Sequence, residues 1–242
     1  MDKVKYKILV MSGKGGVGKT TVATNLAFVL SKKGFKVGLL DIDIHGPNVP
    51  KMLGLEDKTM ESKNNKMIPI NTKEGIKVIS MAFLLKKQDA TIWRGPMKHK
   101  VIQEFIEKAN WGSLDYLIVD APPGTGDEVL SASQILKPIT GSVIVSMPQK
   151  ISLLDAGKSI DFSNKLEIPI IGLIENMSGD IFGKGKVEAF SDEEGTTFLG
   201  SLELDKEITK VNDEGIPFTK TNSKNTSSFK KITDKIINYC VV

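Results

Sequence analysis

One stretch near the amino terminus has the residue types and spacing needed to bind phosphate. Residues 13–20 read Gly-Lys-Gly-Gly-Val-Gly-Lys-Thr and satisfy the pattern G-x-x-x-x-G-K-[ST]. Glycines let successive backbone N–H groups turn inward around an anion, where a Cβ would obstruct them. The Lys19 ammonium can reach the β- and γ-phosphates, and the Thr20 hydroxyl can ligate Mg²⁺. We therefore predict that a nucleotide is bound by Gly13, Lys14, Gly15, Gly16, Val17, Gly18, Lys19, Thr20 and Thr21.

Three aspartates follow apolar runs and could serve phosphoryl transfer, which needs Mg²⁺ and a positioned water. Asp120 comes directly after an apolar run, and we predict that it holds Mg²⁺ with Thr20, either directly or through water. Asp41 and Asp43 end another run, and we expect their side chains to point to opposite sides. Only one of the two should face the γ-phosphate, so Asp41 remains a further candidate metal ligand.

These side chains need a sheet whose strands end beside them. Apolar runs predict strands over residues 7–11, 36–43, 76–82, 116–120, 142–146, 168–174 and 198–202. Helical spacing predicts helices over 20–33 and about 98–109, and the polar stretch 57–75 indicates a surface excursion or small hairpin. The alternation predicts an α/β fold: one domain over residues 1–242, with a doubly wound, mostly parallel sheet and helices on both faces. Ligands of such sheets bind at the carboxyl ends of the strands.

Composition excludes several classes of protein. The chain has 242 residues and a net charge of only +4, with lysines scattered among acids, so we expect no nucleic-acid partner. No apolar stretch approaches the ~20 residues that span a bilayer, and no membrane partner is expected. Cys240 is the only cysteine, which excludes an intrachain disulfide and indicates a cytoplasmic location.

Several segments resemble one known family. Lys14 to Thr20 resembles the deviant Walker A motif of the superfamily that includes MinD and ParA. The segments 41–48, 93–97 and 115–127, together with Glu175-Asn-Met-Ser178, resemble those of the Mrp-type (ApbC-like) ATPases, which are implicated in carrying iron–sulfur clusters. The resemblance covers nearly the whole chain.

The resemblance implies a slow, Mg²⁺-dependent ATPase that works as a homodimeric switch in iron–sulfur cluster assembly or transfer. It implies that Lys14 reaches phosphates bound by the other subunit and that Asp43 orients the attacking water. By the same resemblance, Asp120 and Thr20 organise Mg²⁺ and Asn176 contacts the adenine. The implied cofactors are ATP and Mg²⁺.

The chain departs from the family at one place. Typical members carry a Cys-x-x-Cys pair shortly after the Glu-Asn-Met-Ser segment, whereas here Ser178 leads through Gly179 and Asp180 into Ile181. Cys240 would give a dimer only two thiolates, short of the four that a [4Fe–4S] cluster uses. We therefore expect no self-held bridging cluster, and instead a cluster-bearing partner or a client apoprotein.

Two alternatives remain. A positioning ATPase of the MinD or ParA kind would bind membrane or another macromolecule, and the amphipathic tail 229–239 loosely resembles a membrane-lying helix. We expect this tail to dock on the core instead. A small-molecule kinase ranks last, because no acceptor-binding motif is present and Lys14 would have no role.

Overall fold

The computed structural model describes residues 3–44, 46–85 and 95–241. Its centre is an eight-stranded sheet in the order β10-β9-β8-β1-β7-β2-β6-β5. Every neighbouring pair is parallel except β5 and β6, which are antiparallel. The strands are β1 (Val4–Met11), β2 (Val37–Asp41), β5 (Ile70–Asn71), β6 (Lys77–Ser80), β7 (Leu114–Asp120), β8 (Gly141–Ser146), β9 (Ile170–Ser178) and β10 (Phe198–Glu203).

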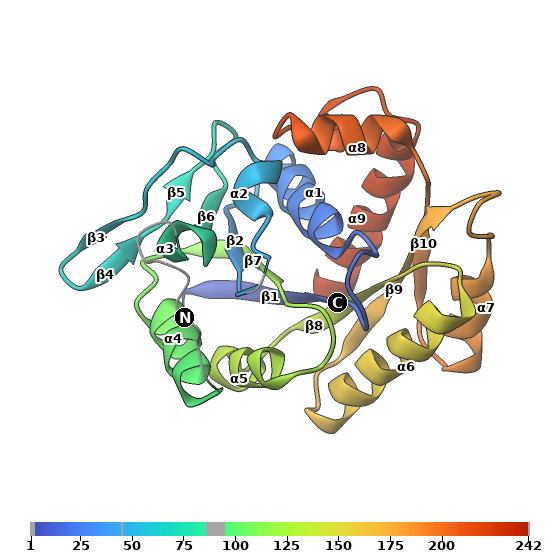
Figure 1. The fold of residues 1–242 in the computed structure, drawn as a ribbon, viewed down its shortest axis with the longest axis horizontal. Coiled ribbons are helices and arrows are strands. Elements are labelled where there is room, and N and C mark those ends of the chain that lie inside the picture. Colours follow the sequence, from blue (N-terminus) through green and yellow to red (C-terminus); the bar gives the residue numbers. More distant parts are fainter. Residues whose placement is uncertain (1–2, 45, 86–94, 242) are drawn as a thin grey trace.

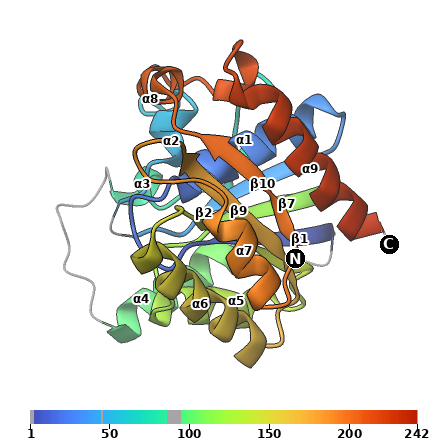
Figure 2. The ribbon, with the colours of Figure 1, turned by 90° about the vertical axis from the view of Figure 1, so that its right-hand side faces the viewer.

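Helices cover both faces of this sheet (Figures 1 and 2). One face carries α4 (Gly95–Glu107), α5 (Asp127–Leu136), α6 (Lys150–Lys165) and α7 (Lys186–Glu193). The other carries α1 (Lys19–Lys32) and α9 (Asn225–Val241), with α8 (Lys206–Asp213) and the short α2 (Val49–Met52) beside them. Two single turns, α3 (Ala82–Leu85) and the 3₁₀ turn η1 (Phe218–Lys220), complete the described helices.

The central strands are buried on both faces, as a parallel sheet covered by two layers of helices requires. In β1 the run Ile8 to Met11 is fully buried, and in β7 so are Tyr116 to Ile118. Such strands must be continuously apolar, which is why their sequences show no polar alternation. The predicted doubly wound, mostly parallel α/β fold is therefore confirmed.

Three local predictions can be compared with the structure. The stretch 57–75 contains an antiparallel hairpin of β3 (Glu61–Lys63) and β4 (Lys66–Ile68), as expected. The strand expected over 36–43 is shorter, because β2 ends at Asp41. The helical tail docks on the core through Phe229, Ile232 and Ile236, whereas Tyr239, at the end of the amphipathic stretch, is 42% exposed. Within the described chain, no helix is long and apolar enough to cross a membrane.

Candidate nucleotide site

The loop between β1 and α1 is shaped by its glycines. Gly16 and Gly18 have φ of 82° and 86°, in the left-handed region that side chains rarely adopt. A Cβ on Gly13 would lie 1.9 Å from the backbone oxygen of Asp155 in α6, and one on Gly18 would lie 2.1 Å from Nδ2 of Asn176. The loop can therefore take this path only with glycine at these positions.

The next two residues of the loop both contact one carboxylate. Nζ of Lys19 lies 2.5 Å from Oδ1 of Asp120, and Oγ1 of Thr20 donates to Oδ2 at 2.8 Å. Asp120 ends β7, beside β1, so the sheet brings it under the loop. Lys19 is 6% exposed and Asp120 is fully buried. Burial raises the pKa of Asp120, against the opposing effects of the Lys19 charge and the hydrogen bonds from Lys19 and Thr20.

Asp41 lies beside Asp120 in the register of β2 and β7 and is also fully buried. Ser80 donates its hydroxyl hydrogen bond to Oδ2 at 2.7 Å, and the backbone N–H of Asp43 donates to Oδ1 at 3.1 Å. Burial, and then repulsion from Asp120, raise the pKa of Asp41 to about 8. A carboxyl with that pKa is mostly protonated at neutral pH, and Asp41 is not among the residues that line the cavity described below.

Asp43 lies just beyond the end of β2, where its Oδ1 accepts the backbone N–H of Gly46 at 3.0 Å. Asp43 lines the cavity and Asp41 does not, so only one of the two faces it. Strand alternation does not separate them, because residues two apart in a strand share a face. The two aspartates differ because the strand ends at Asp41 and the chain leaves the sheet before Asp43.

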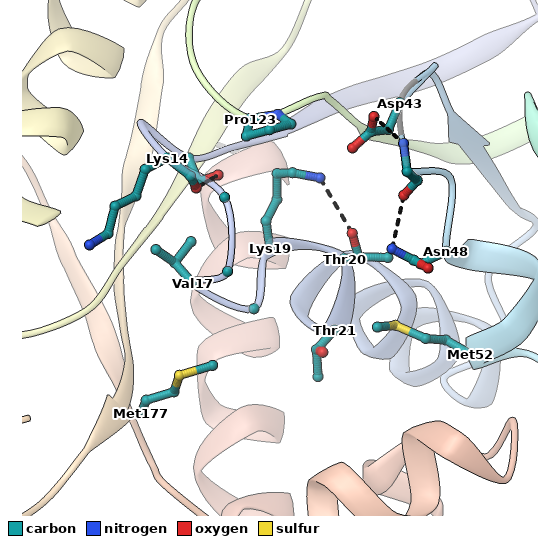
Figure 3. Close-up of a pocket in the computed structure, with 15 residues that line it drawn as sticks. Lys14, Val17, Lys19, Thr20, Thr21, Asp43, Asn48, Met52, Pro123 and Met177 are labelled. Carbon is teal, nitrogen blue, oxygen red and sulfur yellow. Dashed lines mark hydrogen bonds between the residues drawn. The ribbon is translucent and has the colours of Figure 1, made fainter. Parts of the chain in front are cut away.

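Lys14 behaves differently from Lys19. Its backbone carbonyl accepts the hydroxyl of Ser12 at 2.9 Å, and its side chain is partly exposed. In Figure 3 that side chain projects away from the ammonium of Lys19. Lys14 forms no ion pair with any residue that the structure describes, so its charge stays available.

These residues surround an open cavity of about 270 Å³ (Figure 3). Of the residues proposed from sequence, the cavity is lined by Lys14, Gly15, Gly16, Val17, Gly18, Lys19, Thr20, Thr21 and Asp43. Gly13, Asp41, Asp120 and Asn176 lie behind this surface or beside it. The sheet and the loop therefore bring the predicted site residues to one place.

Sequence reasoning missed part of the lining. Asn48 precedes α2 and Met52 is its last residue, Pro123 comes from the loop after β7, and Met177 comes from β9. Met177 has φ of 58°, in the left-handed region, and is partly exposed. Its two neighbours in β9, Asn176 and Ser178, are buried. The resemblance named the segments that contain Asn48, Pro123 and Met177, but no residue-level signal marked any of the four residues.

Asn176, the residue implied to contact adenine, is 6% exposed. Its Nδ2 donates to the carbonyl oxygen of Val17 at 2.8 Å, so the amide supports the loop. Its implied contact with adenine stays a prediction.

Residues suited to hold iron are scarce. Among the residues that the structure describes, no group of three or more His, Cys, Asp or Glu side chains is arranged to hold a metal ion. Cys240 is half-buried on α9, where burial raises the pKa of its thiol to about 11. Nδ1 of His99 lies 2.7 Å from Oγ of Ser131. His45 and Arg94 fall outside the described residues.

A family model and full-chain relatives of this protein all carry names that refer to iron transfer or iron–sulfur clusters. The family model of ParA, described as NUBPL iron-transfer P-loop NTPase, matches residues 3–237. An iron-sulfur cluster carrier protein of Methanocaldococcus jannaschii is 47% identical, over 98% of this chain and 86% of that protein. A cytosolic Fe-S cluster assembly factor NUBP2 homolog of Dictyostelium discoideum is 44% identical, over 97% of this chain and 95% of its own length.

Solved structures agree with these relatives. A nucleotide-binding protein of Archaeoglobus fulgidus in complex with ADP superposes with a TM-score of 0.78 at 36% identity, covering 89% of this chain and 88% of its own. The septum site-determining protein MinD of Pyrococcus horikoshii, complexed with Mg-ADP, superposes with a TM-score of 0.77 at 26% identity, covering 96% and 95%.

Proposed function

The chain belongs to the ParA family of P-loop NTPases, in its NUBPL-type iron-transfer group, and from that premise we propose that it is a Mg²⁺-dependent ATPase acting in iron–sulfur cluster assembly or transfer. The observation that carries the proposal is the convergence of Lys19 and Thr20 on the carboxylate of Asp120, beneath a glycine loop that opens into a cavity. This arrangement suits a triphosphate that arrives with a divalent cation.

The residues at the floor of the cavity fit magnesium, which prefers oxygen ligands. The hydroxyl of Thr20 and the carboxylate of Asp120 are already 2.8 Å apart, and these two groups would hold the ion. When bound, Mg²⁺ would supply positive charge that stabilises the phosphate oxygens. Asp41 is less suited than Asp43 to serve as a further magnesium ligand, because it is hydrogen-bonded to Ser80 behind the cavity.

In this proposal the backbone N–H groups of residues 13–21 hold the phosphates, and Lys19 exchanges Asp120 for the β- and γ-phosphate oxygens. Asp43 orients the attacking water, because it is the aspartate that reaches the cavity. Asn176 keeps the loop against β9 and lies beside the base. The chemistry needs little beyond positioning and charge, so slow turnover suits a switch.

Lys14 acts, in our proposal, on the nucleotide of a partner subunit in a homodimer. Its partly exposed side chain lies at the cavity and projects away from the ammonium of Lys19, which favours a contact in trans. Positive charge supplied in trans stabilises a transferring phosphoryl group.

In our proposal an iron–sulfur cluster is the cargo of this protein and not its resident cofactor. Described residues offer no cluster-binding set, and Cys240 has a raised pKa and half-buried position unsuited to a thiolate ligand. We propose that the chain works with a cluster-bearing partner or a client apoprotein and holds no bridging cluster itself. We place it in the cytoplasm, as the name of the Dictyostelium relative states for that protein.

The positioning-ATPase alternative has less support. Solved MinD structures share the fold at 23–26% identity, whereas full-length relatives at 40–47% identity are named as cluster carriers or assembly factors. The α9 helix, which that alternative would use on a membrane, buries Phe229, Ile232 and Ile236 against the core. ATP-dependent flotation with liposomes, lost on deleting residues 229–242, would favour the alternative.

A mixing experiment tests ATPase activity and the dimer together. We expect Lys14→Ala and Lys19→Ala each to abolish phosphate release from Mg-ATP, the second by abolishing nucleotide binding. A 1:1 mixture should regain up to about a quarter of the activity, because half of the randomly formed dimers are mixed and each has one competent site. Lys58→Ala, which changes an exposed lysine outside the cavity, is the control.

If the unchanged chain does not hydrolyse ATP, the proposal that it is an ATPase is refuted. Activity without rescue in the mixture would refute only the role of Lys14 in trans.

A further inference from the structure

A second cavity lies at the far end of α1 from the phosphate loop. It measures about 480 Å³ and opens between α1, η1 and the start of α9, which contact one another. Helices α1 and α9 lie side by side on one face of the sheet (Figures 1 and 2). Its lining includes four lysines and two apolar side chains: Lys32, Lys33, Lys220, Lys230, Phe28 and Val29. We refer to it as the lysine cavity. Its volume falls in the range of ligand sites, roughly 300–1,000 Å³.

The charges around the lysine cavity are not balanced. Lys33 pairs with Asp234 at 2.8 Å, and Lys220 pairs with Glu74 at 3.1 Å. Lys230 forms no ion pair with any described residue. Two of the four lysines are paired with these acids, so two positive charges at the cavity are not compensated by described residues. The whole chain carries a net charge of +4.

The cavity also has an apolar floor. Phe28 and Val29 are 3% and 4% exposed, and the ammonium of Lys32 lies 5.6 Å from the centroid of the Phe28 ring. Long lysine stems cover apolar surface while keeping their charges in water. A ligand that brings both carboxylates and aliphatic carbon would match this combination.

One carboxylate of the chain, that of Glu74, is already bound beside the lysine cavity. The carboxylate of Glu74 accepts a hydrogen bond from Lys220, and the positive charges of Lys220 and Lys32 hold the pKa of Glu74 below its usual value although burial opposes them. Glu74 comes from the loop before β6, so Lys220 already binds a carboxylate from a distant segment, and the charge of Lys32 acts on the same carboxylate.

From this geometry we propose that the lysine cavity binds an acidic segment of a partner polypeptide, one in which aspartate or glutamate alternates with aliphatic residues. A nucleic acid fits less well, because its phosphates need a basic stripe rather than a single cavity.

The position of the cavity leaves the nucleotide site free. Thr20 lies in the first turn of α1 and Lys32 in its last, so a rise of 1.5 Å per residue separates them by about 18 Å. Asn25, between them, accepts the backbone N–H and the hydroxyl of Thr219 at 3.0 and 2.9 Å, which attaches η1 to α1. Both sites can therefore be occupied at once.

Fluorescence anisotropy with the full chain tests the proposal. The probe is a labelled dodecapeptide that alternates glutamate with leucine, and a lysine–leucine peptide is the negative probe. Lys230→Glu and Lys32→Glu should each weaken binding of the acidic probe tenfold or more, about 1.4 kcal/mol. Lys231→Glu is the matched control, because it makes the same charge change at the next, exposed residue of α9 and does not line the cavity. It should change affinity less than threefold.

Two further arms use single-stranded RNA of 20 nucleotides and vesicles containing anionic phospholipid. Equal loss of peptide binding in Lys230→Glu and Lys231→Glu would overturn the proposal, because binding would then follow net charge. Absence of peptide binding would overturn it as well, including the case in which RNA or vesicles bind in a Lys230-dependent way. Calorimetric titration with Mg-ATP should give the same affinity for Lys230→Glu as for the unchanged chain.

Discussion

Replacing the first glycine of the phosphate loop tests how the loop is seated on the fold. In Gly13→Ala the added Cβ would lie 1.9 Å from the backbone oxygen of Asp155 and 2.1 Å from its carbonyl carbon. Ordinary contacts begin near 3.4 Å, and no rotamer change can help because the obstacle is backbone. Either the loop or α6 must move by more than an ångström.

We expect Gly13→Ala to lower the free energy of unfolding by about 3 kcal/mol, the upper end of the usual cost of overpacking. For a chain of this size that corresponds to a fall in Tm of roughly 6–12 °C, which calorimetry or circular dichroism resolves. ATP affinity should fall with it, because displacement of the loop misaligns its N–H groups.

Gly15→Ala is the matched control in the same loop. Its Cβ would meet only Pro123, at 3.9 and 4.0 Å, and Gly15 does not have a positive φ. Alanine should therefore leave stability within about 0.5 kcal/mol, or raise it slightly by restricting the unfolded chain. Equal Tm values for Gly13→Ala and Gly15→Ala would refute the packing argument.

Four further predictions follow from named contacts. Between pH 4 and 8 the folded Asp41 retains a proton that the unfolded chain has lost, so stability should fall by up to about 1.4 kcal/mol per pH unit as pH rises; Asp41→Asn should flatten that slope in urea titrations, and an unchanged slope would contradict the raised pKa. Lys19→Ala should abolish binding of Mg-ATP in calorimetry and, because it leaves Asp120 without its cation, also lower Tm. Phe229→Ala should cost about 3–5 kcal/mol by opening a cavity under α9, measured by denaturant unfolding. Anaerobic reconstitution with iron and sulfide should give no stoichiometric cluster; a brown species unaffected by Cys240→Ser would contradict the ligand argument.

The sequence predicted which residue types form the site better than it predicted which of these residues contact each other. The glycine pattern, Lys19 and Thr20 follow from the demands of phosphate binding, and apolar runs ending in aspartate follow from a parallel sheet with ligands at its carboxyl edge. The contact of Lys19 with Asp120 joins residues 101 positions apart. It depends on β7 lying next to β1, a strand order that no local pattern encodes.

The lining residues that the sequence did not predict also reach the cavity only through the three-dimensional arrangement of the chain. Met52 and Met177 carry no chemistry that marks them in a sequence, and they reach the cavity through a four-residue helix and a residue with positive φ. The difference between Asp41 and Asp43 likewise depends on where β2 stops. Hydrophobic periodicity locates a strand but gives its end only to within a few residues.

The lysine cavity shows a limit of composition arguments. A net charge of +4 and lysines scattered among acids gave no sign of a basic cluster and argued against a nucleic-acid partner, yet four lysines from three elements meet around one opening. Scattering along a sequence says little about clustering in space, because α1, η1 and α9 are brought together only by the fold.

The hairpin after β9 occupies the position at which typical family members carry a Cys-x-x-Cys pair. Gly179 and Gly183 exchange two backbone hydrogen bonds of 2.8 Å, which leaves three residues in the tip. The buried carboxylate of Glu175 then accepts the N–H groups of Gly185 and Val187 at 3.0 and 3.1 Å, anchoring the hairpin to the start of α7. The hairpin is therefore a short, closed turn that contains no cysteine. In the proposed function, a cluster that this protein helps to move is held by thiolates of another chain.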